Sequence, residues 1–211
     1  MLSTPNRLMN KIRSVCVYCG SSPGHDQRYL KAAHSLGRAV AQAGLGLVYG
    51  GGTRGLMGAV SDSAIRAGGR VIGIIPRFLI NREATEPALD RLHEVLVTDD
   101  MHQRKHAMFE KSDAFVALPG GIGTLEEIVE IMTWAQLGHH RKPIVFANIA
   151  GFWNPMLTLF DHMKSAGFIH SSHLVKPLVI DQADAIVPAI LIAGSSVTEP
   201  TEGVKGVIDR M

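Results

Sequence analysis

The chain has 211 residues and a mass of 22.8 kDa, a size typical of one domain with a three-layer core. Its net charge is only +2 and it has no block of Lys or Arg, which argues against nucleic acid as a partner. No apolar run reaches the roughly 18 residues that a membrane helix needs, so we expect no membrane partner. Residues 1–13 lack the apolar segment of a signal peptide, and the 2 cysteines form no disulfide framework. These features predict a cytoplasmic protein.

Apolar runs and glycine-rich turns predict strands and helices that alternate along the chain. The stretch 77–92 interrupts this pattern because it is charged and contains Pro87, and we predict a loop or a short helix there. Asp99 and Asp100 are candidate caps for the helix that follows the next strand. The predicted strands are 14–20, 45–49, 71–75, 94–98, 114–118, 143–149 and 178–180, and the predicted helices are 26–43, 56–67, 101–111, 128–134, 154–166 and 183–193.

This alternation, with links of about two to six residues, is typical of right-handed βαβ units. We therefore predict an α/β fold, a single-domain, doubly wound (Rossmann-like) parallel sheet of about seven strands with helices on both faces. The domain is predicted to span 14–194, between an N-terminal extension, 1–13, and a frayed polar tail, 195–211. Ligands of such folds bind beyond the carboxyl ends of the strands.

Three glycine turns follow predicted strands, after Tyr18, Tyr49 and Leu118, and all three therefore lie on that edge of the sheet. Glycine lets the backbone approach a ligand closely, because it has no Cβ. The third turn also precedes a helix, whose N-terminal N–H groups and partial positive charge suit a phosphate. The candidate ligand contacts in the first two turns are Gly20, Ser21, Gly51 and Gly52.

The second turn matches the dinucleotide fingerprint through Gly50-x-Gly52-x-x-Gly55. That fingerprint also needs an Asp or Glu about 20 residues later, which binds the ribose of NAD. The chain has Arg77 at the end of the next strand, so NAD binding fails this test and NADP binding remains only through Arg77. A mononucleotide phosphate or a ribose fits the turn better, and there is no Walker-type triphosphate motif.

The third turn carries carboxylates that allow two interpretations. Thr124 and Glu127 have the spacing of a capping box, with threonine as N-cap and glutamate at the third helical position. On local sequence, that interpretation is at least as well supported as a catalytic glutamate. Glu126, Glu130 and Thr133 share one helical face, which either lines a pocket or is exposed to solvent.

The helix predicted at 101–111 places two cations beside its apolar face, since Arg104 and Lys105 lie on the same side as Met108. Either the two side chains extend past the core to solvent, or one or both reach over the sheet edge toward an anion. The local sequence supports the two interpretations about equally.

Metal and redox chemistry find little support in the sequence. Cys16 and Cys19 form a CxxC, but Cys16 lies within a strand, and the period of two sends the thiols to opposite faces. We interpret both as small buried residues. His102 and His106 have i,i+4 spacing without the carboxylate of an HExxH motif, so we predict no metal site.

Two motifs together resemble the Lonely Guy (LOG) family: PGGxGTxxE at 119–127 and MHxRK at 101–105. The resemblance covers residues 14–180 and includes the sequence VCVYCGS at 15–21 and GGG at 50–52. Members of this family are cytokinin riboside 5′-monophosphate phosphoribohydrolases, which were long mislabelled as lysine decarboxylases. Lysine decarboxylation would call for a pyridoxal-phosphate apparatus, and no lysine of this sequence is marked for it.

The resemblance implies hydrolysis of the N-glycosidic bond of N6-substituted adenosine 5′-monophosphates, with AMP as a further candidate substrate. The products would be the free base and ribose 5-phosphate. It implies Arg104 and Glu127 as catalytic residues, a nucleotide monophosphate as the small-molecule partner, a homodimer and no cofactor. The substrate contacts that it implies are Glu83, Lys105, Gly120, Gly121, Ile122, Gly123, Thr124, Leu125, Glu126 and Thr133.

The residue types fit this chemistry. Breaking a glycosidic bond builds positive charge on the ribose, which a carboxylate such as Glu127 or Glu126 can stabilise while it activates water. Arg104 can orient the phosphate or assist the leaving base, and the sequence leaves both roles open. The main alternative is a non-catalytic nucleotide-binding or sensing protein, which shares the glycine turns without needing Arg104 and Glu127 together. An NADP-binding enzyme is the second alternative.

Overall fold

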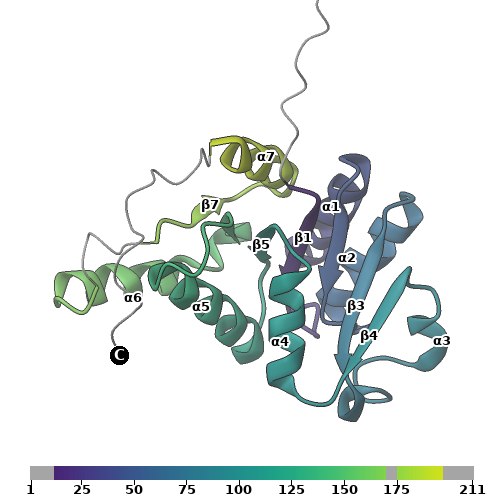
Figure 1. Cartoon of the computed structure of the whole chain (residues 1–211). Helices are drawn as coiled ribbons and strands as arrows, with labels where there is room; N and C mark the ends of the chain where they lie inside the picture. Colours follow the sequence, from purple (N-terminus) through teal and green to yellow (C-terminus); the bar gives the residue numbers. More distant parts are fainter. Residues whose placement is uncertain (1–11, 170–174, 197–211) are drawn as a thin grey trace, which may run out of the picture.

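The computed structural model describes residues 12–169 and 175–196, which contain one seven-stranded sheet of parallel strands. Strands alternate with helices along the chain, so the predicted doubly wound α/β fold is confirmed (Figure 1). Most of the predicted extension and tail (1–11 and 197–211) lies outside the described residues. The strands are β1 (Ser14–Tyr18), β2 (Gly46–Tyr49), β3 (Val71–Pro76), β4 (Glu94–Thr98), β5 (Ala114–Ala117), β6 (Ile144–Ala147) and β7 (Leu178–Ile180).

Helices cover both faces of the sheet, with α1, α2 and α7 on one face and α4, α5 and α6 on the other (Figure 1). Within the described ranges, no helix has both the length and the apolarity to cross a membrane. The helices are α1 (Gln27–Gln42), α2 (Gly55–Arg66), α3 (Glu86–Leu89), α4 (Met101–Glu110), α5 (Ile122–Gln136), α6 (Asn154–Ser165) and α7 (Ile186–Ser196), with single 3-10 turns at η1 (Arg77–Leu79), η2 (Ile149–Gly151) and η4 (Ala183–Ala185).

The strand order β4-β3-β2-β1-β5-β6-β7 places β1 between β2 and β5. The chain therefore runs outward from β1 to β4 and then returns to the other side of β1. Val17 of β1 pairs with Tyr49 of β2 and with Val116 of β5, so the turns after these three strands leave the sheet at the same edge. This reversal is the topological switch point, where doubly wound folds bind their ligands.

Side chains of β1 alternate between the two apolar cores, as expected for a strand covered on both faces. Val15 and Val17 pack with α1, α2 and α7, whereas Cys16 and Tyr18 pack with α4, α5 and α6. Cys19 belongs to the first of these cores. The prediction that both cysteines are buried on opposite faces is therefore confirmed, and both thiols are free.

The start of α5 differs from the prediction. The helix begins at Ile122 with Gly121 as its N-cap, and no side chain caps it. Thr124 is therefore already inside the first turn and Glu127 lies in the second, so the capping-box interpretation is wrong, as is the predicted helix start at residue 128. Glycine is itself accepted at an N-cap, which lets the helix begin directly after the glycine pair. As a result, the Glu127 carboxylate makes no capping hydrogen bond to the N-terminus of α5.

Candidate active site

A cavity of about 300 Å³ lies at the switch point, beside the turns that follow β1, β2 and β5. Arg104 from α4 and Glu127 from α5, the two predicted catalytic residues, both line it. The cavity thus brings together residues that are distant in the sequence. The other predicted contacts that line it are Gly20, Ser21, Glu83, Gly121, Ile122, Gly123 and Thr124.

The glycine turns are joined to one another by backbone hydrogen bonds. The Gly20 N–H donates to the Pro119 carbonyl (3.1 Å), and the Leu56 N–H donates to the Gly20 carbonyl (3.0 Å). A Cβ on Gly120 would lie 2.6 Å from Thr124 Cβ and 2.9 Å from the Gly20 nitrogen. Only glycine permits this close approach, which joins the first and third turns at the rim of the cavity.

The second turn holds the segment that carries Glu83. The Thr53 N–H and the Thr53 Oγ1 both donate to the Glu83 carbonyl, at 2.9 and 3.2 Å. The same segment is closed by the Asn81 N–H, which donates to the Ala84 carbonyl at 2.8 Å. Ala84 is buried against Ile75 at the end of β3. These contacts bring the Glu83 side chain to the cavity that Glu127 lines.

The N-terminus of α5 opens into the cavity through Gly121, Ile122 and Gly123. The N–H groups of a first helical turn have no acceptor within the helix. Because no side chain caps α5, these donors are free to meet a ligand at the positive end of the helix dipole. This end of the cavity is therefore suited to a phosphate or a carboxylate.

Arg104 is buried, with only 6% of its surface exposed. It lies in the first turns of α4, whose N-cap Asp100 accepts a hydrogen bond from the Gln103 N–H at 2.8 Å. The Arg104 Nη2 donates to the Gly50 carbonyl (3.2 Å), and Nη1 lies 3.6 Å from Met101 Sδ. Among the described residues, nothing accepts a hydrogen bond from its buried Nε. A buried charged donor without a partner suits a site where a ligand supplies the acceptor.

Glu127 faces Arg104, with 4.0 Å between Glu127 Oε1 and Arg104 Nη2. Burial raises the pKa of Glu127 to about 7, and the nearby Glu126 and Glu83 carboxylates act in the same direction. Arg104 and Lys105 oppose this rise by stabilising the charged form. A carboxyl group that titrates near neutral pH is well matched to general acid–base work.

Lys105 is bound by carboxylates outside this cavity. Its Nζ lies 2.6 Å from Glu126 Oε1 and 3.1 Å from Glu130 Oε1. Partial burial alone would lower the pKa of Lys105, but the two carboxylates raise it above its ordinary value. The predicted polar stripe on α5 therefore binds Lys105, and neither Lys105 nor Glu126 is among the residues that line the cavity.

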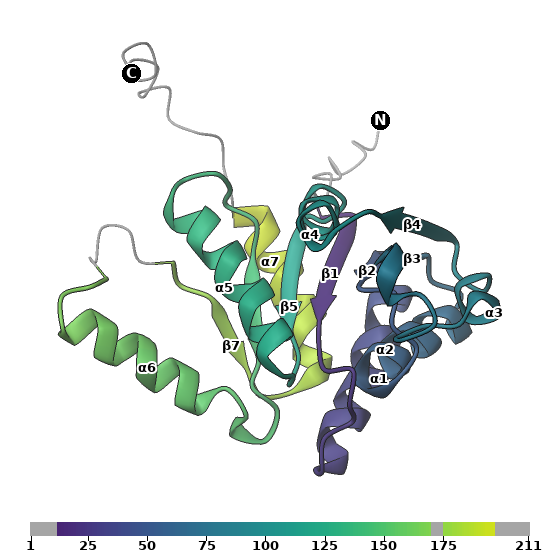
Figure 2. The same cartoon turned by 90° about the horizontal axis from the view of Figure 1, so that it is seen from below.

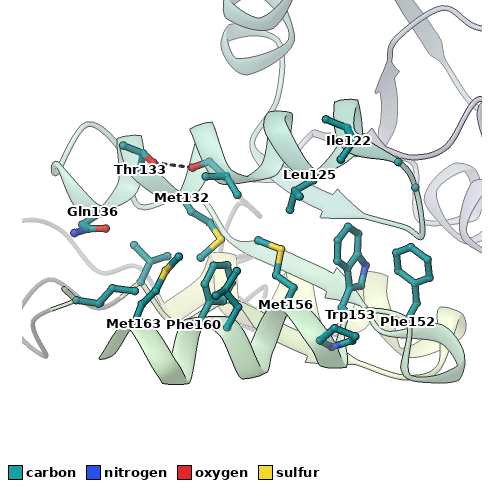
Figure 3. Close-up of a pocket in the computed structure, with 17 residues that line it drawn as sticks. Ile122, Leu125, Met132, Thr133, Gln136, Phe152, Trp153, Met156, Phe160 and Met163 are labelled. Atoms are coloured by element: carbon teal, nitrogen blue, oxygen red, sulfur yellow. Dashed lines mark hydrogen bonds between the residues drawn. The ribbon is translucent and has the colours of Figure 1, made fainter. Parts of the chain in front are cut away.

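A second cavity, of about 770 Å³, lies between α5 and α6, which run side by side (Figures 2 and 3). It adjoins the first cavity at Gly121 and Ile122, which line both. Three predicted contacts, Gly120, Leu125 and Thr133, line this cavity instead of the first. Most of its side chains are apolar, and Leu125 and Met132 of α5 point toward Met156 and Phe160 of α6 in Figure 3. Among them are Leu125, Val129, Met132, Trp153, Met156, Leu159, Phe160 and Met163.

Like Lys105 and Glu126, the predicted contacts Gly51 and Gly52 line neither cavity. Gly51 has a positive φ of 77° and packs against Ile75, and Gly52 packs against Met57. Backbone conformation thus explains the glycine at position 51, and close packing within the second turn explains the glycine at position 52.

Six residues that line the first cavity were not predicted from the sequence. Tyr18 ends β1 and Cys19 follows it at the ligand-binding edge, and this position was the available signal for both. Burial raises the pKa of the Cys19 thiol, so it stays protonated and is not a nucleophile. The six residues are Val17, Tyr18, Cys19, Gly50, Met57 and Met108.

Comparisons with known proteins agree with the motifs. The family model described as "Possible lysine decarboxylase" matches residues 57–190. The cytokinin riboside 5′-monophosphate phosphoribohydrolase LOG7 of Arabidopsis thaliana is 44% identical, over 83% of this chain and 79% of the relative. The corresponding enzyme LOG of Oryza sativa subsp. japonica is 48% identical, over 76% of this chain and 65% of the relative.

This chain belongs to the LOG family. The family predicted from the two motifs is thereby confirmed.

Solved structures share the fold of this LOG-family chain. The X-ray structure of TM1055 has a TM-score of 0.65 at 24% identity and covers 85% of this chain and 98% of that chain. The molybdenum cofactor carrier protein of Chlamydomonas reinhardtii has a TM-score of 0.62 at 20% identity and covers 87% of this chain and 99% of that chain. At such identities the similarity concerns the fold alone.

Proposed function

We propose that this chain hydrolyses the N-glycosidic bond of N6-substituted adenosine 5′-monophosphates, releasing the free base and ribose 5-phosphate. The relatives are named phosphoribohydrolases, which supports the reaction class. The observation that carries the site assignment is the buried pair of Glu127, with a pKa of about 7, and Arg104 beside the uncapped N-terminus of α5. A protein that only binds nucleotides has no use for this pair.

Glu127 is proposed to act on the ribose carbon. The bond from C1′ to the base nitrogen breaks, its electron pair leaves with the base, and the base takes up a proton. The Glu127 carboxylate stabilises the positive charge that develops on the ribose. It also accepts a proton from the water whose oxygen bonds to C1′, and this proton balances the one that the base takes up. The unused Nε of Arg104 supplies a hydrogen bond to the substrate, either at the phosphate or at the leaving base.

The phosphate is proposed to bind at the N-terminus of α5, where the N–H groups at 121–124 meet the cavity. This placement separates two tasks: backbone donors hold the phosphate while Glu127 works on the ribose. It also predicts a strong preference for the monophosphate over the nucleoside, because the nucleoside lacks the group that these donors bind.

The apolar cavity between α5 and α6 supports the proposal that the base of the substrate carries an N6 substituent. It begins at Gly121 and Ile122, directly beside the catalytic cavity, and offers Met132, Met156 and Phe160 as apolar contacts. An isopentenyl-type group buried there would gain about 0.8 kcal/mol per CH₂ group. We therefore expect an N6-substituted monophosphate to have a lower KM than AMP.

The test is chromatography of the products from a panel of purine and pyrimidine 5′-monophosphates and their nucleosides. We expect free base and ribose 5-phosphate from adenine-type monophosphates, and a Glu127→Gln variant that is folded but inactive. Glu110→Gln is the matched control, since Glu110 is an exposed glutamate on α4. Equal rates for nucleoside and monophosphate, or full activity of Glu127→Gln, would contradict the proposal.

We also propose a homodimer that forms over α5 and α6. Ile122 (81% exposed), Leu159 (47%) and Val129 (38%) are large apolar side chains that border the same cavity. Exposed apolar clusters of this kind often mark protein interfaces. Light scattering coupled to size exclusion should give twice the chain mass for the wild type and a smaller mass for Leu159→Asp. A monomeric wild type would contradict this proposal.

A cytoplasmic location is proposed as well, because free buried cysteines are typical of proteins in a reducing compartment. Fractionation of cells that produce the full-length chain should recover it with cytoplasmic markers, and recovery with membranes or in the medium would refute it.

A further inference from the structure

The second glycine turn has a contact that phosphate binding does not explain. The Gly50 carbonyl accepts a hydrogen bond from Arg104 Nη2 at 3.2 Å, and among the described residues no other oxygen accepts a hydrogen bond from this guanidinium. The position that a Gly50 Cβ would occupy is filled by Arg104 Nη2, and it lies 3.2 Å from Arg104 Cζ and 3.4 Å from Met57 Sδ. The guanidinium of Arg104 thus occupies the space that the Cβ of any other residue at position 50 would need.

We propose that Gly50 is a positioning residue for Arg104, which it holds both through its carbonyl and through the space left by its missing Cβ. This role rests on the proposed function of Arg104 at the catalytic cavity, which Gly50 also lines. It differs from the roles of the next two glycines. Gly51 is needed for its positive φ of 77°, and Gly52 for its packing against Met57.

A side chain at position 50 should displace Arg104 without changing the backbone. Gly50 is not among the glycines with positive φ, so alanine can adopt its conformation. The three atoms nearest to such a Cβ belong to the flexible side chains of Arg104 and Met57, and none of the three is a backbone atom. The guanidinium is therefore the group that moves, and it loses the Gly50 hydrogen bond when it does.

Displacement of Arg104 has an electrostatic consequence at Glu127. Burial raises the pKa of Glu127, and the Arg104 guanidinium partly offsets that rise. Moving the guanidinium away should therefore raise the pKa of Glu127 further. A change that only loosened the fold would expose Glu127 to water and shift its pKa in the opposite direction.

The experiment compares kcat/KM of the wild type, Gly50→Ala, Arg104→Ala and the double variant on an N6-substituted adenosine monophosphate. Gly50→Ala should lower kcat/KM on the order of 10²-fold, as expected for a displaced catalytic group. The acidic limb of its pH profile should move to higher pH. In the Arg104→Ala background the same substitution should have almost no effect, because the obstructing group is gone. Gly46→Ala is the matched control in β2, where a Cβ would meet only ordinary contacts at 3.7 Å, and should behave as wild type.

Equal losses from Gly50→Ala in both backgrounds would overturn the inference, as would a wild-type pH profile for Gly50→Ala. If Gly50→Ala does not fold, the double variant should fold, and unfolding of both would refute the role. NMR titration of the Glu127 carboxyl in Gly50→Ala gives a readout that needs no turnover. A wild type without base release would instead refute the proposed function, and the titration would still decide the role of Gly50.

Discussion

Replacing Glu127 with glutamine should stabilise the protein above neutral pH while it removes activity. The folded state holds the Glu127 proton with a pKa of about 7, against an ordinary value of 4.5, chiefly because the carboxyl group is buried. The folded state therefore binds the proton more tightly than the unfolded state. As pH rises from 4.5 to 7, the free energy of unfolding falls, and above pH 7 the full cost of an ionised Glu127 is present.

The size of this cost follows from the two pKa values. The difference between 4.5 and 7, at 1.36 kcal/mol per pH unit, is on the order of 3 kcal/mol. The attraction of Arg104 is already contained in the folded pKa. Glutamine has nearly the same shape and is neutral, so Glu127→Gln should gain this amount at pH 8 and almost nothing at pH 4. For a chain of this length the gain corresponds to a rise in Tm of roughly 6–12 °C.

Urea unfolding of the wild type and Glu127→Gln from pH 4 to pH 8.5 measures this effect, and thermal melts give a second readout. Glu110→Gln is again the control, and its stability difference from wild type should not show a step near pH 7. A stability difference between Glu127→Gln and wild type that is the same at pH 4 and pH 8 would refute the reasoning. So would a glutamine variant that is less stable throughout.

Three further variants test the parts around this carboxylate. Lys105→Met removes a charge that lowers the pKa of Glu127, so the acidic limb of kcat/KM should move to higher pH, and an unmoved limb would argue against the coupling. Asp100→Ala removes the N-cap of α4 and should lower the free energy of unfolding by about 1 kcal/mol in urea, whereas an unchanged midpoint would show that the cap adds no stability. Gly120→Ala places a Cβ against Thr124 and should lower kcat/KM on the order of 10²-fold, and wild-type kinetics would mean that the turn can give way.

The sequence predicted most of the fold because strands buried on both faces and glycine turns are local signals. β4 and β7 have the predicted bounds, and β1 and β5 differ only at their carboxyl ends. The helix α5 was the main local error: it spans Ile122–Gln136 instead of the predicted 128–134, and the spacing of Thr124 and Glu127 only imitates a capping box. That motif describes a pair of residues, but the glycine before it decides where the helix starts.

The location of the site could be predicted from the sequence, but the different roles of Arg104 and Lys105 could not. Strand direction predicts the edge of the sheet where the glycine turns meet, and the resemblance to the LOG family implies Arg104 and Glu127, which the structure places at one cavity. Arg104 and Lys105 are adjacent and both cationic, so only packing distinguishes their roles. One is buried against Gly50 in the cavity, and the other is bound by Glu126 and Glu130 outside it.

By itself, the sequence determined the alternation of strands and helices, the edge on which the three glycine turns lie, and the family. These properties depend on residues that are close in the chain. The tertiary structure decided that β5 returns beside β1, which joins the first and third turns and places α4 and α5 at one cavity. It also decided that Glu127 is buried, which raises its pKa to about 7. Burial depends on which distant segments exclude water from a side chain, and no local pattern contains that information.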